Sequence, residues 1–229
     1  MALRIGVGGR RWDPWEHLCA GCCSSPGIAA ERRQAWRRFW LVDPLDGTRE
    51  FIKRNGEFTV NIALIEDGAP VLGVVHAPAL ELTYWAARGR GAFKQAGLSE
   101  PVAIRACDYR STGLRIVASR SHAGEVLPRF LAALGDPPCV SQGSSLKLCL
   151  VADGTANLYP RFGPTMEWDV AAAHCIVNEA GGSVTAVDGA PLRYGKADLH
   201  NPWFVVAGNP AYPWQAAYAA LELEPVGES

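Results

Sequence analysis

Long apolar runs and an excess of charge of either sign are both missing from this sequence of 229 residues. No apolar run approaches the roughly 18 residues that a membrane-spanning helix needs, and residues 1–11 lack the apolar stretch of a signal peptide. The 22 Lys+Arg and 23 Asp+Glu leave a net charge of −1, which gives no electrostatic footprint for nucleic acid or an anionic membrane. We therefore expect a cytoplasmic protein that neither binds nucleic acid nor spans a membrane, with peripheral association at the inner membrane as an alternative.

A disulfide framework is also not expected. The 7 cysteines are an odd number in a chain that is too long to depend on disulfide bonds, so reduced thiols are favoured. The run Cys19-x-x-Cys22-Cys23 could suggest zinc, but a structural zinc site uses four nitrogen or sulfur ligands. No second Cys/His pair follows at the usual spacing, which leaves free thiols as the simpler interpretation.

Residues 1–38 have no regular pattern of apolar side chains. They are rich in Arg, Trp, Gly and Cys and show neither alternation nor a helical stripe, so we expect an atypical, poorly ordered segment without a stable element. Gly6-x-Gly8-Gly9 could be a nucleotide-binding loop, but only a five-residue lead precedes it and no amphipathic helix follows. A flexible terminus is the favoured interpretation.

Residues 39–110 predict an antiparallel-sheet subdomain for metal and phosphate. Strands are expected at 39–42, 58–65, 70–76 and 82–87, with a helix starting at 49–53. Alternation in 58–65 puts Phe58, Val60, Ile62 and Leu64 on one face, and Asp67-Gly68 turns the chain tightly into the next strand. Residues 97–110 are expected to connect this subdomain to the next.

Residues 111–229 predict a second subdomain of α/β type that contacts the nucleotide. Strands are expected at 114–118, 156–159, 183–187 and 204–208, and helices at 125–134, 144–152, 167–180 and 213–223. Gly181-Gly182 closes the third of these helices. The whole chain is therefore expected to have a layered α+β to α/β architecture.

The stretch Asp43-Pro44-Leu45-Asp46-Gly47-Thr48 carries the strongest chemical signal. Two carboxylates that follow a buried strand can converge on a hard cation, and the Leu45 carbonyl can add an oxygen ligand. Gly47 allows close approach of the backbone, and free amides at the following helix start could receive a phosphate. An Asx turn that caps a helix explains the same residues, and the spacing alone leaves both interpretations open.

Glu167-Trp168-Asp169 supplies a third acid at the start of a predicted helix. Carboxylates in a first helical turn usually act as caps that complement the helix dipole. Helical periodicity places Asp169 at the edge of the core-facing side, so it could also reach a site formed by another segment.

These two segments resemble the two signature motifs of the inositol monophosphatase superfamily, a family of metal-dependent, lithium-sensitive phosphatases. The second motif continues as Trp168-Asp-Val-Ala-Ala172 and Glu179-Ala-Gly-Gly182. The longer run from Trp40 to Ile65 is similar to CysQ-type 3′(2′),5′-bisphosphate nucleotidases. Three further motifs share this similarity: Ser119-Arg-Ser-His122, Gly143-Ser-Ser-Leu-Lys147 and Leu158-Tyr-Pro-Arg-Phe-Gly-Pro-Thr165. The resemblance covers roughly residues 31–208 and implies a layered αβαβα sugar-phosphatase-like fold.

For this family the resemblance implies hydrolysis of the small-molecule substrate adenosine 3′,5′-bisphosphate to AMP and phosphate with Mg²⁺, in sulfur metabolism. Carried over residue by residue, the metal ligands would be Asp43, Asp46, Asp169 and the carbonyl of Leu45. The phosphate would be contacted by Gly47 and Thr48, and catalysis would depend on Asp46 and on the Thr48 hydroxyl, which would hold the attacking water. The residues that match family positions around the nucleotide and its second phosphate are Ser119, His122, Ser144, Lys147 and Arg161, and Asp169 would also contact the substrate.

The N-terminal part departs from the family pattern. The family begins with a helical hairpin that carries a water-orienting Asp, followed by a strand ending in Glu-Glu, one of which binds metal. Family spacing puts this acidic pair near Cys22–Ser25, where the chain reads Cys-Cys-Ser-Ser, and Glu31 is expected in the following loop. A truncated or frame-shifted start is the hypothesis, and sequencing upstream would contradict it if no family-like hairpin appeared in another frame.

This departure has two expected consequences. Without the Glu ligand and the water-orienting Asp, hydrolysis should be far slower than in a full-length relative. A missing hairpin should also uncover apolar surface on the first sheet, which predicts aggregation or a homodimer. The alternatives to the nucleotidase activity are an inositol-phosphate or sugar-bisphosphate phosphatase, and a catalytically impaired nucleotide-binding remnant.

Overall fold

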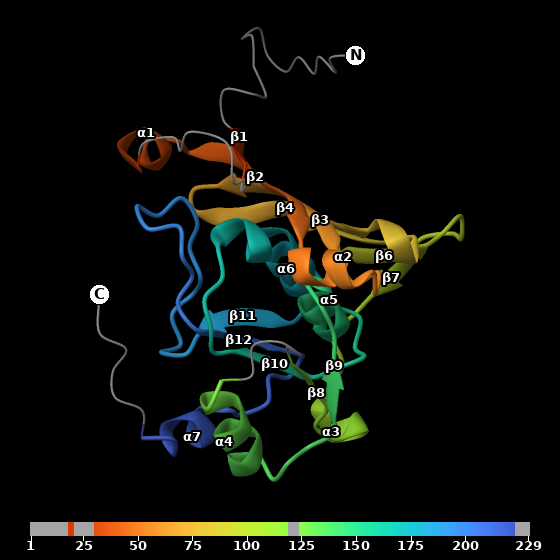
Figure 1. The fold of residues 1–229 in the computed structure, drawn as a ribbon, viewed down its shortest axis with the longest axis vertical. Helices are drawn as coiled ribbons and strands as arrows, with labels where there is room; N and C mark the ends of the chain where they lie inside the picture. The colour runs from red at the N-terminus through yellow and green to blue at the C-terminus, as the bar shows by residue number, and fades with distance from the viewer. Residues whose placement is uncertain (1–17, 21–29, 119–123, 223–229) are drawn as a thin grey trace, which may run out of the picture.

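The computed structural model describes residues 18–20, 30–118 and 124–222, which form two β-sheets with helices between and below them (Figure 1). A seven-stranded sheet follows the chain order from β1 to β7. Its strands are β1 (Leu18–Ala20), β2 (Arg38–Asp46), β3 (Thr59–Glu66), β4 (Ala69–Ala77), β5 (Leu82–Ala87), β6 (Ala92–Ala96) and β7 (Val102–Ile104). All neighbours pair antiparallel except β1 and β2, which are parallel. The predicted antiparallel sheet that contains residues 58–65 and 70–76 is thus confirmed.

The second sheet has five strands in the order β11-β12-β10-β8-β9. These strands are β8 (Ile116–Ala118), β9 (Cys139–Ser141), β10 (Leu158–Arg161), β11 (Ser183–Ala186) and β12 (Phe204–Ala207). β10 pairs parallel with β8 and antiparallel with β12, so the sheet is mixed. Residues that are far apart in the chain therefore meet in this sheet, as the α/β pattern of the second half predicts.

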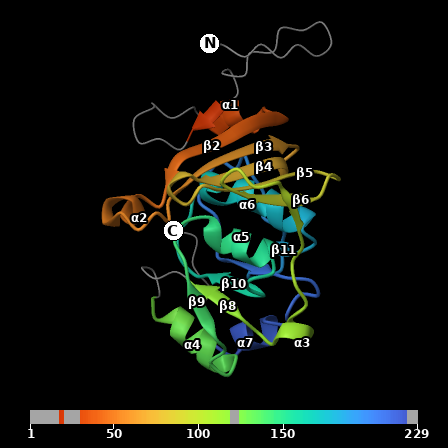
Figure 2. The ribbon, with the colours of Figure 1, turned by 90° about the vertical axis from the view of Figure 1, so that its right-hand side faces the viewer.

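Helices α5 (Leu146–Ala152) and α6 (Glu167–Glu179) lie between the two sheets in both ribbon views (Figures 1 and 2). Helices α4 (Val126–Ala133) and α7 (Gln215–Ala219) lie on the opposite side of the second sheet. Four short helices complete the fold: α1 (Ala30–Gln34), α2 (Thr48–Lys53), the 3₁₀ helix η1 (Pro78–Leu80) and α3 (Tyr109–Thr112). No helix in the described ranges is both long and apolar enough to span a membrane.

Helix α6 packs directly on strands β3, β4 and β5 of the first sheet. Val170, Ile176 and Val177 are at most 1% exposed and form part of the main core. Gly73 of β4 is required for this close approach, since a Cβ atom there would lie 2.1 Å from the carbonyl oxygen of Ala172. The helix that carries Asp169 is therefore fixed on the sheet that carries Asp43 and Asp46.

The alternation of β3 is as predicted, but its apolar side is not the most buried one. Thr59 and Asn61 belong to the buried set with Ala63 and Ile65, whereas the face that contains Val60 and Ile62 is only half-buried. Thr59 and Asn61 face the interior because both donate hydrogen bonds to a carboxylate of the site described below. Polar side chains at core positions are typical of functional sites.

Three expectations about short elements were wrong. Within residues 1–38, β1 gains its hydrogen bonds by pairing with β2, and Glu31 lies in the first turn of α1 rather than in a loop. The rest of that segment, 1–17 and 21–29, lies outside the described residues. Residues 97–110 are not a plain connection, because they contain the edge strand β7, in which Val102 pairs with Lys94 of β6. β9 was also missed, since strands of three residues are too short to show a period and depend on tertiary pairing.

Candidate metal and phosphate site

Three carboxylates converge at the point where β2 ends and α6 begins. Asp43, Asp46 and Asp169 each offer a ligand oxygen within 4.8 Å of the others, although Asp169 is far away in the sequence. Asp43 is only 7% exposed. The predicted convergence is confirmed, whereas the role of these acids as metal ligands stays a prediction.

The end of β2 is shaped by an irregularity in its pairing with β3. The register shifts between Asp43, opposite Asn61, and Asp46, opposite Thr59. The backbone N–H of Leu45 donates to Asp43 Oδ1 at 2.9 Å, which is an Asx turn. The two interpretations of this stretch, turn and acidic cluster, therefore both hold, and the carbonyl of Leu45 stays a predicted ligand.

Gly47 connects this turn to α2. Its φ of 84° lies in the left-handed region, and Gly47 occupies the N-cap position of the helix that starts at Thr48. A Cβ atom on Gly47 would lie 3.2 Å from the Cβ of Ser144. Ser144 itself has a φ of 48°, which is unusual for a residue with a side chain. The backbone of Gly47 is thus packed closely against the side chain of Ser144.

Asp46 is held by three side chains, of which Ser145 makes the shortest contacts. Ser145 donates to Asp46 Oδ2 through both its backbone N–H and its hydroxyl, each at 2.7 Å. The same Oγ lies 2.6 Å from the carbonyl oxygen of Asp169 and accepts a hydrogen bond from Asn61 at 2.8 Å. Thr59 and Asn61 complete the set at 3.2 and 3.3 Å from Asp46 Oδ2. Ser145 therefore links the two acidic segments.

Asp169 is a cap and a member of the cluster at the same time. Its Oδ2 accepts the backbone N–H of Met166 at 2.9 Å, which ties the carboxylate to the entry of α6. Asp169 therefore has both of the positions that the sequence allows, at the helix cap and within reach of the other two acids. The cap fixes the orientation of Asp169, and the cluster supplies its chemistry.

Two of the three acids are harder to ionise than a free aspartate. Burial, together with the charge of Asp46, raises the pKa of Asp43 to about 6 and that of Asp169 to about 7. A divalent cation offsets such repulsion, and carboxylate oxygens are the ligands that hard cations prefer. The donor set fits a hard metal ion.

A cavity of about 290 Å³ opens beside the cluster. Its lining includes Asp46, Gly47, Thr48, Ser144, Lys147, Arg161 and Asp169. The structure thus brings seven of the predicted site residues to one cavity. Ser119 and His122 lie outside the described residues.

Three cationic residues line the cavity beside its acids, namely Arg49, Lys147 and Arg161. Lys147 is 6% exposed, and its Nζ donates to the carbonyl of Ser144 at 2.6 Å and lies 5.7 Å from the ring centroid of Tyr159. Burial lowers the pKa of Lys147 to about 8, although Asp46 favours its charged form. Arg161 donates to the carbonyl of Pro164 at 2.7 Å, while its buried Nε has no hydrogen-bond partner within the described part of the chain. The buried Ser144 Oγ, judged against the same described residues, also has none.

A model of the inositol monophosphatase family matches residues 22–221. The chain belongs to this family. Enzymes of the family are metal-dependent, which agrees with the acidic cluster.

Two similar proteins within the family are bisphosphate nucleotidases by name. The chain is 53% identical over 179 residues to the 3′(2′),5′-bisphosphate nucleotidase CysQ of Salmonella typhimurium, which covers 78% of this chain and 71% of the relative. The protein of the same name from Haemophilus influenzae is 36% identical over 195 residues, or 83% and 72% of the two chains.

Solved structures support the same fold. CysQ from Bacteroides thetaiotaomicron, a bacterial member of the family, superposes with a TM-score of 0.76 at 43% identity, covering 83% of this chain and 76% of that one. Inositol monophosphatase from Anabaena has a TM-score of 0.68 at 26% identity, covering 91% and 79%. The predicted layered α/β fold of the family is confirmed.

The sequence did not single out Ser145, Asn61 or Thr59 as site residues. A signal for the last two was present, because they are polar residues on alternate positions of an otherwise apolar strand. Ser145 lies next to Ser144 in the same motif and lines the same cavity, and only the three-dimensional contacts show that Ser145 is the one that supports Asp46.

Proposed function

We propose that the chain is a Mg²⁺-dependent phosphomonoester hydrolase that removes the 3′-phosphate of adenosine 3′,5′-bisphosphate and gives AMP and phosphate. One observation carries this proposal: two members of the three-carboxylate cluster, Asp46 and Asp169, line one cavity together with the cations Lys147 and Arg161. The acids suit a metal ion at the phosphate that reacts, and the cations suit a second phosphate on the same substrate. The names of the relatives described above agree with this substrate class.

The chain's own residues would bind and orient the substrate. Asp43, Asp46 and Asp169 would hold Mg²⁺, which when bound supplies Lewis-acid stabilisation of the phosphoryl and leaving oxygens. Gly47 and Thr48 line the cavity beside Asp46, where the amide of Gly47 would receive the phosphate and the Thr48 hydroxyl would hold the attacking water. Ser144 Oγ and Arg161 Nε lack partners within the described ranges and so are available as donors to the substrate.

The substitution Lys147→Met tests the assignment of the second phosphate. Methionine fills the same space in this buried position, so the change removes the charge with little loss of packing. We expect kcat/KM for adenosine 3′,5′-bisphosphate to fall about tenfold or more, which is the loss of one charge-assisted hydrogen bond. For adenosine 3′-monophosphate, which lacks the second phosphate, kcat/KM should stay within about twofold. Equal losses for the two substrates would contradict this role for Lys147.

An inositol-phosphate or sugar-bisphosphate phosphatase is the runner-up, and the two cations favour the nucleotide bisphosphate over inositol 1-phosphate, which carries no second phosphate.

A nucleotide-binding chain of low turnover is a second candidate. The cluster contains three acids within the described residues, and the additional Glu ligand of the family pattern was not recognised in the sequence. A chain that is stabilised by adenosine 3′,5′-bisphosphate in a thermal unfolding assay, yet releases no phosphate, would support this candidate. Cytoplasmic location and a homodimer stay predictions, which cell fractionation and sedimentation equilibrium can test.

A further inference from the structure

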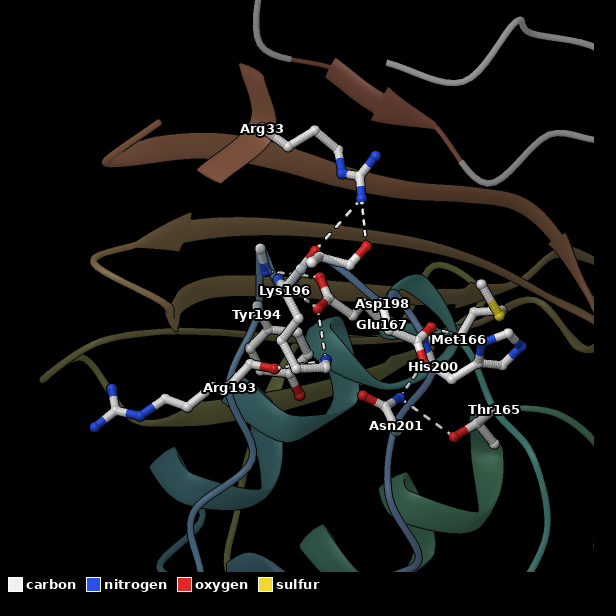
Figure 3. A network of polar contacts seen from close by, with 12 residues as sticks. Arg33, Thr165, Met166, Glu167, Arg193, Tyr194, Lys196, Asp198, His200 and Asn201 are labelled. Atoms are coloured by element: carbon white, nitrogen blue, oxygen red, sulfur yellow. Dashed lines mark hydrogen bonds and ion pairs between the residues drawn. The ribbon is translucent and has the colours of Figure 1, made fainter. Parts of the chain in front are cut away.

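A loop that follows the second sheet's strand β11 holds the start of α6 through a buried carboxylate (Figure 3). Glu167, the first residue of α6, is 0% exposed. Its Oε2 accepts the backbone N–H of Gly195 at 2.7 Å, and its Oε1 accepts the backbone N–H and the Nζ of Lys196 at 3.0 and 2.6 Å. A carboxylate that is fully buried persists only when its charge is compensated in this way.

The next residues of the same loop form hydrogen bonds with the backbone that leads into α6. The backbone N–H of Glu167 donates to the carbonyl of Leu199 at 2.9 Å. Asn201 donates its backbone N–H to the carbonyl of Thr165 and its side-chain amide to the carbonyl of Met166, both at 2.8 Å. Residues 165–167 are therefore held on both their backbone and their side chains by residues 195–201.

This entry segment is the one that orients Asp169. The N–H that Asp169 Oδ2 accepts belongs to Met166, whose carbonyl is bound by Asn201. A shift of Met166 would move the hydrogen bond that fixes the Asp169 carboxylate relative to Asp43 and Asp46. Residues that hold a metal ligand in place without touching the metal typically have a large effect on metal affinity.

The opposite side of the loop is held by α1. Arg33 is 9% exposed and donates to the carbonyls of Lys196 and Ala197 at 3.4 and 2.9 Å. Figure 3 shows Arg33 reaching from above toward Lys196, with Glu167 on the other side of that residue. The loop is thus clamped between α1 and the start of α6.

We propose that Glu167 and Lys196 form a positioning pair that sets the orientation of Asp169 for metal binding. The proposal rests on the proposed function only in taking Asp169 as a metal ligand. Neither residue lines the cavity, so the pair acts through the entry of α6 and not by touching the substrate.

A second buried ion pair in the same molecule provides a matched control. Lys94 Nζ lies 2.7 Å from Asp153, whose side chain is 5% exposed, and Lys196 Nζ lies 2.6 Å from Glu167, whose side chain is 0% exposed. Lys94 is in β6 and does not line the cavity beside the three acids. Lys94→Met and Lys196→Met therefore remove the same group from similar pairs, and both are expected to lower the midpoint of urea unfolding.

Only Lys196→Met should change metal binding. With Mn²⁺ as the probe and electron paramagnetic resonance of the free ion as the readout, we expect its dissociation constant to rise about tenfold or more. Lys94→Met should stay within about twofold of the unchanged chain, and Lys196→Arg, which keeps a cationic donor, should restore most of the affinity. Asn201→Ala removes the hydrogen bond to the Met166 carbonyl and leaves the contacts of the Glu167 carboxylate in place, and it should also weaken Mn²⁺ binding. This variant tests the proposal if Lys196→Met does not fold.

The outcomes separate this inference from the proposed function. If the unchanged chain binds Mn²⁺ but Lys196→Met and Asn201→Ala bind it equally well, the positioning role is overturned and the proposed function stands. Equal weakening in Lys94→Met would also overturn it, because loss of stability alone would then explain the effect. An unchanged chain that binds no Mn²⁺ would overturn both the metal-dependent function and this inference.

Discussion

Removal of the Ser145 hydroxyl should weaken both the fold and the metal site. Ser145 is 2% exposed, and its Oγ lies within 2.8 Å of Asp46 Oδ2, the Asp169 carbonyl and the Asn61 amide. In Ser145→Ala, Asp46 loses one donor of its set, and the Asn61 amide loses the hydroxyl oxygen that accepts its hydrogen bond. Loss of these buried hydrogen bonds should lower the free energy of unfolding by about 1–3 kcal/mol. Asp46 would also be less firmly oriented, which should weaken Mg²⁺ binding about tenfold.

Ser144→Ala is the matched control for stability. The neighbouring Ser144 Oγ is buried without a hydrogen-bond partner within the described residues, so its removal should change the free energy of unfolding by at most about 0.5 kcal/mol. Urea denaturation measures both variants, and calorimetric titration with Mg²⁺ measures the affinity. Equal loss of stability in the two variants would refute the assignment of Ser145 as the link between Asp46 and α6.

Two further predictions follow from the acidic cluster and from the packing of α6. The pKa values of Asp43 and Asp169 are raised to about 6 and about 7, so without metal their protonated forms favour the folded state. This contribution to the free energy of unfolding is fully present below about pH 4 and is lost as pH rises through 7. Mg²⁺ should therefore raise the melting temperature much more at pH 8 than at pH 5.5, and an equal shift at both pH values in thermal unfolding would contradict this. Gly73→Ala should lower the free energy of unfolding by about 3 kcal/mol or more, because its Cβ would overlap the Ala172 carbonyl. In Gly89→Ala the added Cβ has no atom within 4 Å, so the free energy of unfolding should fall by only about 1–2 kcal/mol because of the left-handed backbone. If urea denaturation gave similar losses for Gly73→Ala and Gly89→Ala, this would contradict the packing account.

Strands β3, β4 and β5 could be predicted because each has five or more residues of strand pattern, and Asp67-Gly68 marks the turn between the first two. For β2 the sequence predicts only residues 39–42, whereas the strand continues to Asp46. Leu82–Ala87 was predicted with the bounds that the structure has. β7 and β9 could not be predicted, because three exposed or half-buried residues at a sheet edge have no period of their own. They form strands because β6 and β8 offer them unpaired backbone groups.

The acids of the site could be predicted from local motifs, but the residues that support them could not. Asp43, Asp46 and Asp169 lie at element ends, where spacing alone suggests chemistry. Glu167 was interpreted as part of a helix cap, whereas its carboxylate is compensated by Gly195 and Lys196 from a distant loop. Such compensation depends on tertiary contacts and leaves no trace in local periodicity. The sequence also predicts that a helix starts at residue 144, whereas α5 starts at Leu146 and Ser144 has a left-handed backbone, which a motif of small residues does not reveal.

Phosphate release by the whole chain tests the central claim most directly. Adenosine 3′,5′-bisphosphate and inositol 1-phosphate are each supplied with Mg²⁺ or with a chelator, and kcat/KM is measured for each. We predict release from the bisphosphate that requires Mg²⁺, with kcat/KM about tenfold or more above that for inositol 1-phosphate, because only the bisphosphate has a second phosphate for Lys147 and Arg161. Undiminished release in the chelator, or equal or faster release from inositol 1-phosphate, would contradict the account.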